Sequence, residues 1–256
     1  MIISLVQQDI IWEDRAANLS ALEKLLEPLH GVSDLVILPE MFNSGFSMDP
    51  GKIAERPGGT TMEWMLDQAR KGDFGICGSY TVEEEGRFFN RFVFASPASE
   101  VIKYDKRHLF GLAGERDLFS PGFERTVFRF RGMRIFPLVC YDLRFPVWSR
   151  NKNDYDLLIY PANWPASRNL AWNTLLRARA IENQCYTAGV NRVGTDGSGT
   201  SYCGESAVYR YDGETVAFAG SSGEAVISAL ISSEELISFR KKFPFLDDAD
   251  KFTIEV

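Results

Sequence analysis

The chain has 256 residues, of which 45% are hydrophobic and 25% are charged, and its formal net charge is −7. This composition is typical of a globular protein with a substantial core. The acidic excess argues against a nucleic-acid partner, because such proteins present a basic face. No apolar run reaches the roughly 18 residues that a membrane helix needs, so we expect no membrane partner. The N-terminal residues lack the basic leader of a signal peptide, and we expect a cytoplasmic location.

Strand and helix patterns alternate through the first half of the chain. Strand patterns cover 2–8, 34–38, 75–82, 88–96 and 101–104, and helical spacing covers 14–29 and 61–71. A charged residue follows two of these strands, Glu40 after the second and Lys106 after the fifth. Ligands bind at the carboxyl ends of strands in open α/β sheets, so both residues are candidates for a functional site.

The second half of the chain is also predicted to be α/β. Strand patterns cover 126–130, 133–139, 156–160, 184–191, 206–211, 214–219 and 224–230, and helical spacing covers 169–183 and 233–239. We expect the last three strands to form a meander. The glycines near residue 197 do not have the spacing of a dinucleotide-binding loop and precede no helix, so they predict a turn. No linker interrupts the chain, which favours one layered domain with two sheets.

Cys140 follows the apolar run 135–139, just before a polar turn. A strand that ends in a sharp turn can present a nucleophile and leave backbone N–H groups free for an oxyanion. The competing interpretation is an inert core thiol. The four cysteines, Cys77, Cys140, Cys185 and Cys203, are widely spaced and only two histidines accompany them. This pattern favours neither a disulfide framework nor a zinc site.

Glu40, Lys106 and Cys140 share a position at strand ends, although each one alone could be a surface or core residue. If the three strands are neighbours, the side chains converge. A carboxylate beside a thiol can act as general base, and an ammonium together with the Tyr141 N–H can stabilise a tetrahedral oxyanion. The expected chemistry is hydrolysis through an acyl-thioester.

Three segments carry a resemblance to a known family. They are Leu38-Pro39-Glu40-Met41-Phe42, Lys106-Arg107-His108-Leu109-Phe110 and Cys140-Tyr141-Asp142-Leu143-Arg144-Phe145-Pro146. In this order they resemble the nitrilase (carbon–nitrogen hydrolase) superfamily. The resemblance implies a four-layer α-β-β-α sandwich, with residues 1–256 forming a single carbon–nitrogen hydrolase domain. It also implies a homodimer or higher homo-oligomer and no metal or organic cofactor.

The same resemblance implies a catalytic triad of Glu40, Lys106 and Cys140. The family has a second acidic residue in the loop after the lysine, which implies Glu115 here, with Asp117 as the alternative. Within the superfamily the likeness is greatest to bacterial omega-amidases, which deamidate 2-oxoglutaramate and 2-oxosuccinamate. Many relatives carry Glu after the Arg-Phe-Pro sequence, whereas this chain has Val147.

An omega-amidase must hold a distal carboxylate, for which a guanidinium is the natural partner. Arg116 and Arg144 are the candidates, although Arg144 could instead form a salt bridge with Asp142. Aromatic residues near strand ends are expected either to line the substrate pocket or to belong to the core; these are Phe42, Phe46, Tyr141 and Trp164. His30 is expected to lie at a helix end, and His108 near the site without acting as base.

Two other functions are compatible with the sequence. The protein could hydrolyse a nitrile or an N-carbamoyl amino acid, which are substrates of other superfamily members. Alternatively, it could be a catalytically silent scaffold that retains the fold for binding. The presence of all three triad residues favours an enzyme that acts on a small-molecule amide.

Overall fold

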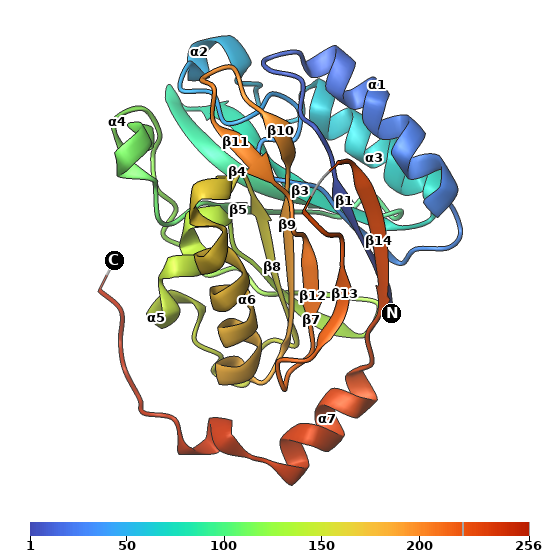
Figure 1. Ribbon diagram of the computed structural model, residues 1–256, viewed down its shortest axis with the longest axis vertical. Helices are drawn as coiled ribbons and strands as arrows, with labels where there is room; N and C mark the ends of the chain where they lie inside the picture. The colour runs from blue at the N-terminus through green and yellow to red at the C-terminus, as the bar shows by residue number, and fades with distance from the viewer. Residues whose placement is uncertain (222, 256) are drawn as a thin grey trace.

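Two six-stranded sheets stack face to face, and helices cover both outer surfaces (Figure 1). The computed structural model describes residues 1–221 and 223–255. The architecture is therefore the α-β-β-α sandwich expected from the sequence, and both sheets belong to one domain.

The first sheet has the strand order β14-β1-β2-β3-β4-β5. Its strands are Ile2–Gln7 (β1), Leu35–Ile37 (β2), Gly75–Glu84 (β3), Arg87–Ala95 (β4), Val101–Asp105 (β5) and Ala225–Leu230 (β14). Strands β1, β2 and β3 are parallel, and the remaining pairs are antiparallel.

The second sheet has the order β13-β12-β9-β8-β7-β6. Its strands are Phe128–Phe130 (β6), Met133–Pro137 (β7), Leu157–Ala162 (β8), Tyr186–Asn191 (β9), Ala207–Tyr209 (β12) and Thr215–Phe218 (β13). Strands β7, β8 and β9 are parallel, so the second sheet repeats the pairing pattern of the first. A separate hairpin joins Val193–Thr195 (β10) to Ser201–Cys203 (β11).

The helices differ in length and in position. The longer ones are Arg15–Leu26 (α1), Thr60–Gly72 (α3), Asn169–Asn183 (α6) and Ser233–Lys242 (α7), and the short ones are Pro50–Ile53 (α2), Glu115–Leu118 (α4) and Pro146–Ser149 (α5). Single 3-10 turns occupy Glu27–Leu29 (η1), Gly111–Ala113 (η2), Cys140–Arg144 (η3), Ala166–Arg168 (η4) and Phe245–Asp248 (η5). Helices α1 and α3 lie together on the first sheet, whereas α6 lies on the second (Figure 1).

The apolar runs of the central strands are continuous because both faces of each strand are buried. Ile3 and Leu5 of β1 belong to the larger hydrophobic cluster, which also includes residues of the second sheet. Val6 of the same strand and Val36 of β2 face the other way and pack with Leu22 of α1. Alternation of side chains along a strand therefore supplies two cores from one apolar sequence.

The last three strands do not form the meander that the sequence predicted. Strands β12 and β13 pair with each other, but β14 crosses to the first sheet and pairs antiparallel with β1, with Ile2 opposite Leu230. A strand pattern specifies which residues are extended but not which distant strand they join. The pairing of β14 with β1 brings the first and last strands of the chain together. The segment between β13 and β14 thereby links the two sheets.

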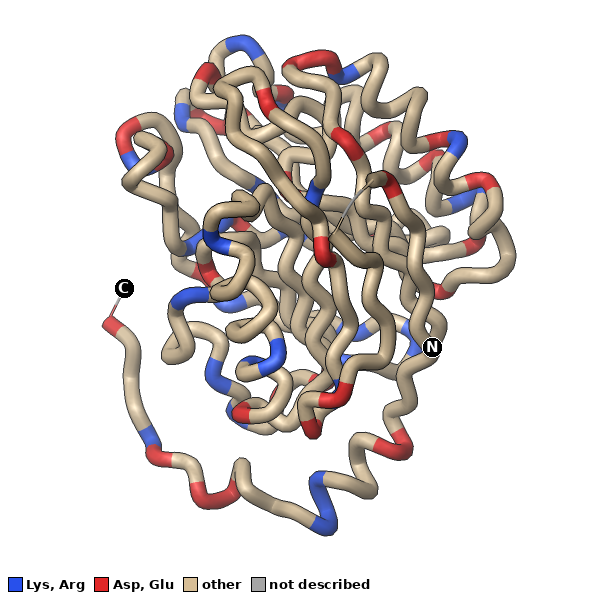
Figure 2. Tube along the Cα trace, in the orientation of Figure 1, with Lys and Arg blue, Asp and Glu red and all other residues tan. Residues whose placement is uncertain are grey.

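Basic and acidic residues are interspersed along the trace rather than gathered into one basic stripe (Figure 2). Among residues 1–221 and 223–255, no helix is both long and apolar enough to cross a membrane.

Candidate active site

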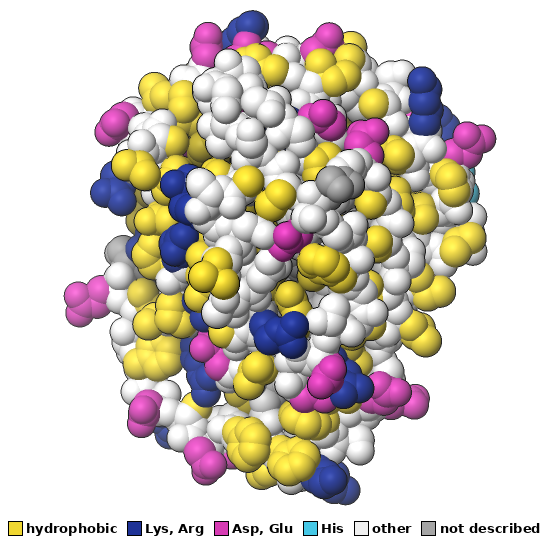
Figure 3. Space-filling model, in the orientation of Figure 1, with side chains coloured by type: hydrophobic (Ala, Val, Ile, Leu, Met, Phe, Trp, Pro, Cys, Tyr) yellow, Lys and Arg dark blue, Asp and Glu magenta, His cyan; other side chains and the backbone are white. Residues whose placement is uncertain are grey.

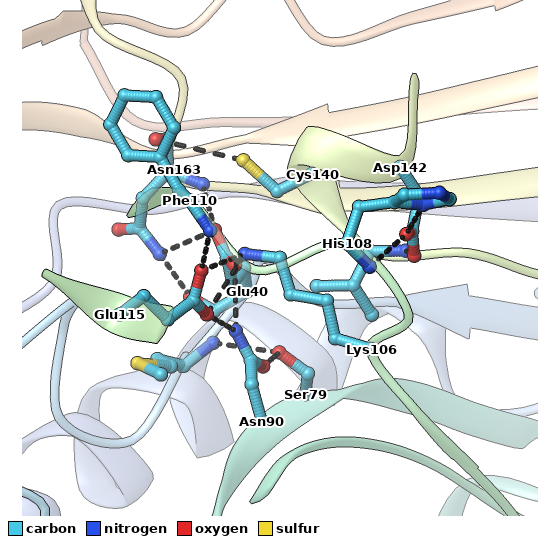
Figure 4. A network of polar contacts seen from close by, with 12 residues as sticks. Glu40, Ser79, Asn90, Lys106, His108, Phe110, Glu115, Cys140, Asp142 and Asn163 are labelled. Carbon is cyan, nitrogen blue, oxygen red and sulfur yellow. Dashed lines mark hydrogen bonds and ion pairs between the residues drawn. The ribbon is translucent and has the colours of Figure 1, made fainter. Parts of the chain in front are cut away.

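The side chains of Glu40, Lys106, Glu115 and Cys140 meet between the two sheets (Figure 4). Glu40 follows β2 and Lys106 follows the edge strand β5 of the same sheet, whereas Cys140 follows β7 of the other sheet. The three strands are therefore not all neighbours, although convergence was expected from neighbouring strands. Face-to-face stacking of the sheets brings the residues together instead.

Lys106 lies between two buried carboxylates. Its Nζ donates to Glu40 Oε1 at 2.8 Å and to both oxygens of Glu115, at 3.0 and 2.9 Å. Lys106 is 1% exposed and both glutamates are 0% exposed. Asp117, the alternative to Glu115, is exposed on α4 and has no contact of this kind in the described part of the chain.

Glu40 receives further hydrogen bonds from two asparagines. Asn90 Nδ2 donates to Glu40 Oε1 at 2.8 Å and to Glu115 Oε1 at 3.0 Å, and Ser79 Oγ donates to Asn90 Oδ1 at 2.8 Å. From the second sheet, the Asn163 N–H donates to Glu40 Oε2 at 2.8 Å. Asn163 Nδ2 donates to the Glu40 carbonyl at 2.6 Å. The carboxylate is thus fixed by both sheets.

Cys140 stands at a sharp turn, as the sequence predicted. Its φ is 44°, in the left-handed region that a residue other than glycine seldom adopts, and it begins the 3-10 turn η3. The thiol is 8% exposed, and its Sγ lies 3.9 Å from the carbonyl oxygen of Asn163. The Tyr141 N–H is among the first of this turn, where backbone donors lack partners within the helix.

The charges around the thiol set its protonation. Burial raises the pKa of Cys140 well above its ordinary value, and the negative charge of Glu40 adds to this effect, while Lys106 opposes it. Burial alone would lower the pKa of Lys106, but the charges of Glu115 and Glu40 raise it. Burial also raises the pKa of Glu115, against the effect of Lys106. These effects favour a neutral thiol beside a protonated lysine at neutral pH.

Asp142 organises the turn that carries the cysteine. Its Oδ2 accepts from the Val139 N–H at 2.9 Å and from Tyr104 Oη at 2.8 Å. Its Oδ1 accepts from the His108 N–H at 2.9 Å and lies 2.7 Å from His108 Nδ1. Arg144 forms no salt bridge with Asp142, contrary to the alternative raised from the sequence. His108 is held by Asp142 and stacks on Phe145.

A pocket of about 540 Å³ opens above Cys140 and Lys106. The residues that line it are Trp12, Phe46, Met48, Lys106, Phe110, Leu112, Ala113, Cys140, Tyr141, Arg144, Asn163, Trp164, Pro165, Arg168, Asp196, Ser198, Thr200 and Tyr202. Among the described residues, no group of three or more His, Cys, Asp or Glu side chains is arranged to hold a metal ion.

The pocket includes some of the expected substrate-binding residues and not others. Arg144 and Trp164 line it. Phe42 does not, because it is fully buried in the core against Trp64 and Tyr80. Arg116 is exposed on α4 and is not part of the lining. A sequence cannot distinguish a pocket wall from a core position when both are aromatic or flank a strand end.

Sequence reasoning missed one wall of the pocket. Trp12 comes from the loop after β1, and Tyr202 from the β10–β11 hairpin. The hairpin tip packs on the indole so closely that a Cβ on Gly197 would lie 2.4 Å from Trp12 Nε1. Arg168 was also missed, although its place shortly after Asn163 at a strand end offered a signal.

Comparisons with known proteins find relatives over nearly the whole chain. A model of the carbon–nitrogen hydrolase family matches residues 2–241. The chain is 46% identical to the omega-amidase YafV of Escherichia coli (strain K12) over 252 residues, which is 98% of either chain. It is 32% identical to the 2-oxoglutaramate amidase of Bacillus subtilis (strain 168), over 97% of either chain.

A solved structure shares the whole fold. It is the crystal structure of a CN-hydrolase superfamily protein from Xanthomonas campestris with an arsenic adduct in its active site. The TM-score is 0.97 and the identity 44%, over 100% of this chain and 99% of that one. The nitrilase-type sandwich expected from the three sequence segments is thereby confirmed. The chain therefore belongs to the carbon–nitrogen hydrolase family.

Proposed function

We propose that the protein is a cysteine-dependent amidohydrolase that releases ammonia from the terminal amide of 2-oxo acid amides. The observation that carries the proposal is the buried Glu40–Lys106–Glu115 cluster beside Cys140, at the floor of a pocket. A site of this kind provides a base, an oxyanion donor and a nucleophile for acyl transfer.

In the proposed first half of the reaction, Glu40 takes the thiol proton while Cys140 Sγ attacks the amide carbon. The high pKa of the thiol makes this base necessary. The oxyanion of the tetrahedral intermediate accepts from Lys106 Nζ and from the Tyr141 N–H. Glu40 then passes the proton to the amide nitrogen, the C–N bond breaks, and ammonia leaves an acyl-thioester.

In the second half, Glu40 takes a proton from water as the water oxygen attacks the thioester carbon. The same donors stabilise the second oxyanion. The C–S bond breaks, the thiol of Cys140 recovers its proton from Glu40, and a carboxylic acid is released and ionises. Glu115 holds Lys106 in place throughout, because it contacts the ammonium with both oxygens.

The proposed substrates are 2-oxoglutaramate and 2-oxosuccinamate. Relatives that align over nearly the whole chain are named omega-amidase and 2-oxoglutaramate amidase. The composition of the pocket supports a small anionic substrate, since aromatic side chains such as Trp164 accompany Arg144 in its lining.

A substrate panel tests the proposal. Ammonia release from 2-oxoglutaramate and 2-oxosuccinamate is expected to far exceed release from nitriles or N-carbamoyl amino acids. The Cys140→Ala variant is expected to lose activity by roughly three orders of magnitude or more. Faster hydrolysis of a nitrile or a carbamoyl compound would replace the proposed substrate class. Equal, negligible rates for wild type and Cys140→Ala on every compound would indicate a silent scaffold.

We also propose that the enzyme acts in the cytoplasm as a homodimer or higher homo-oligomer. Val147 of α5 and Leu170 and Ile181 of α6 are exposed apolar side chains, and exposed apolar surface of this kind favours association. Light scattering after size-exclusion chromatography measures the assembly directly.

A further inference from the structure

Among the residues that the structure describes, no acidic side chain pairs with two arginines of the pocket. Arg144 and Arg168 are half-buried and line the same cavity as Cys140. Within the described part of the chain, neither guanidinium takes part in an ion pair or a side-chain hydrogen bond, although most other half-buried arginines here form ion pairs. Removing a cation from water without a counter-charge is costly, so unpaired guanidinium groups in a pocket indicate a site for an anion.

Aromatic rings hold both guanidinium groups by their faces. The Cζ of Arg144 lies 4.8 Å from the ring centroid of Trp164, and the Cζ of Arg168 lies 5.1 Å from that of Phe110. A cation–π contact of this kind uses none of the N–H donors at the planar edge of the guanidinium, so they remain available. A planar edge of this kind matches a carboxylate, which it can bind with two parallel hydrogen bonds.

The other charged side chains of the pocket, Lys106 and Asp196, have partners within the protein. Lys106 is bound to Glu40 and Glu115. Asp196, the acidic residue in the lining, accepts from the Ser198 and Thr200 N–H groups at 2.9 Å and from Tyr202 Oη at 2.7 Å. Its carboxylate therefore stabilises its own hairpin tip, and the positive charge of the two arginines is left for a ligand.

The chain connects both arginines to the reacting groups. Arg144 ends η3, the turn that begins with Cys140, and Arg168 ends η4, which closely follows Asn163. Both cations are therefore connected to residues beside the thiol by short segments rather than by long loops, since the Asn163 carbonyl oxygen lies 3.9 Å from Cys140 Sγ. Figure 3 shows basic side chains interleaved with hydrophobic ones over the N-terminal end of α6, where η4 leads into this helix.

We propose that Arg144 and Arg168 together form the subsite that binds the carboxylate at the far end of the substrate from the amide. This inference rests on the proposed function and names its specificity determinants. Two guanidinium groups in the same pocket as Cys140 select amides that carry a carboxylate at a matching chain length. A neutral amide of the same length gains none of these bonds.

The test compares two amides that differ in one group. 4-Oxopentanamide has the skeleton of 2-oxoglutaramate with a methyl group in place of the carboxylate. The measured quantity is the ratio of kcat/KM for 2-oxoglutaramate to that for 4-oxopentanamide, in wild type and in Arg144→Met and Arg168→Met. Each substitution is expected to lower this ratio by roughly 10- to 100-fold, the range of a charge-assisted hydrogen-bond pair. Arg168→Lys retains the charge without the planar edge, and its ratio is expected to lie between those of wild type and Arg168→Met.

Arg116→Met is the matched control, because Arg116 is exposed on α4 and lies outside the pocket lining. Its ratio is expected to equal that of wild type. A wild type that prefers 2-oxoglutaramate, with an unchanged ratio in both Met variants, would overturn the subsite and leave the proposed function intact. A wild type without any preference for the carboxylated amide would also overturn the subsite.

If the proposed function itself were wrong, neither amide would release ammonia. The subsite is then tested by calorimetric titration with 2-oxoglutarate, the product. Affinity is expected to fall about tenfold or more in Arg144→Met and Arg168→Met and to remain unchanged in Arg116→Met. Equal affinity in all four proteins would overturn the subsite.

Discussion

The carboxylate of Glu40 is immobilised by donors from three directions. Lys106 and Asn90 donate to one oxygen, and the backbone and side chain of Asn163 donate to the other, at 2.8 and 3.4 Å. If Glu40 is the base, as proposed, a carboxylate fixed in this way needs no reorganisation when the thiol proton is transferred. Because the pKa of Cys140 is raised, the proposed mechanism requires a base to form the thiolate at neutral pH.

Glu40→Gln is expected to reduce kcat by about 10²- to 10⁴-fold, the usual contribution of a general base. Glutamine has nearly the same shape but cannot take the proton from Cys140. Steady-state kinetics on 2-oxoglutaramate gives the effect, and circular dichroism and urea unfolding establish that the variant is folded. Near wild-type turnover in a folded Glu40→Gln protein would remove Glu40 from the proposed mechanism.

At the scale of elements, the turn η3 depends on a side chain inside it. Asp142 is fully buried and accepts from the Val139 N–H, just before Cys140, and from the His108 N–H, two residues after Lys106. It therefore joins the segment that carries the thiol to the segment that carries the ammonium. Its side chain acts on the position of Cys140 and Lys106 and has no contact with the pocket.

Asp142→Asn is expected to lower kcat by roughly tenfold or more with a smaller change in KM, because a small misplacement of reacting groups is costly. The amide can accept on one atom only, so two of the donors to Asp142 lose their partner. The rate of Cys140 alkylation by iodoacetamide, measured well below the unfolding temperature, should change as well.

Asp156→Asn is the matched control for this experiment, since Asp156 is also a buried aspartate with several donors but lies away from the site. It is expected to lose stability while keeping its kcat and its alkylation rate. If both variants lost kcat in proportion to their stability, the positioning role of Asp142 would be refuted.

The elements that the sequence predicted well are those with local signals. The helix over 169–183 matches α6 at both ends, and Glu40, Lys106 and Cys140 follow strands as expected. The contacts that assemble the site are not local: Glu40 meets Asn163 across 123 residues, and Lys106 meets Glu40 across 66. Periodicity carries no information about such pairs, so neither these contacts nor the role of Asp142 could be predicted, although the sandwich itself was expected from the family resemblance.

Which residues line the pocket could not be predicted from the sequence either. Phe42 and Phe46 are four residues apart in one loop and are of one residue type, yet the first is core and the second lines the pocket. Trp12 lines the pocket from a distant loop, where the tip of the β10–β11 hairpin packs against its indole. The family resemblance supplied the order of the motifs, but the wall formed by this hairpin requires the folded chain.

At the scale of the whole molecule, Asp156 connects the second sheet to the C-terminal helix. Its carboxylate accepts from Arg134 of β7 at 2.9 and 2.7 Å and from Arg240 of α7 at 2.8 Å. Arg240 also donates to the Gln184 and Tyr155 carbonyls. These contacts hold α7, which otherwise lies at the margin of the sandwich (Figure 1).

Asp156→Asn is expected to lower the free energy of unfolding by about 1–3 kcal/mol at about pH 7, because two arginines lose their counter-charge. Burial alone would raise the pKa of Asp156, but the hydrogen bonds and charge of Arg134, with that of Arg240, lower it below the ordinary 3.8. A carboxyl whose pKa is lower in the folded state stabilises the fold above its unfolded pKa and loses this contribution as the pH falls through the folded pKa. Urea unfolding of both proteins should therefore give a difference that is constant from about pH 7 to 5 and shrinks below about pH 4. A difference that stayed constant into the acid range would show that the loss comes from packing rather than from the charge of Asp156.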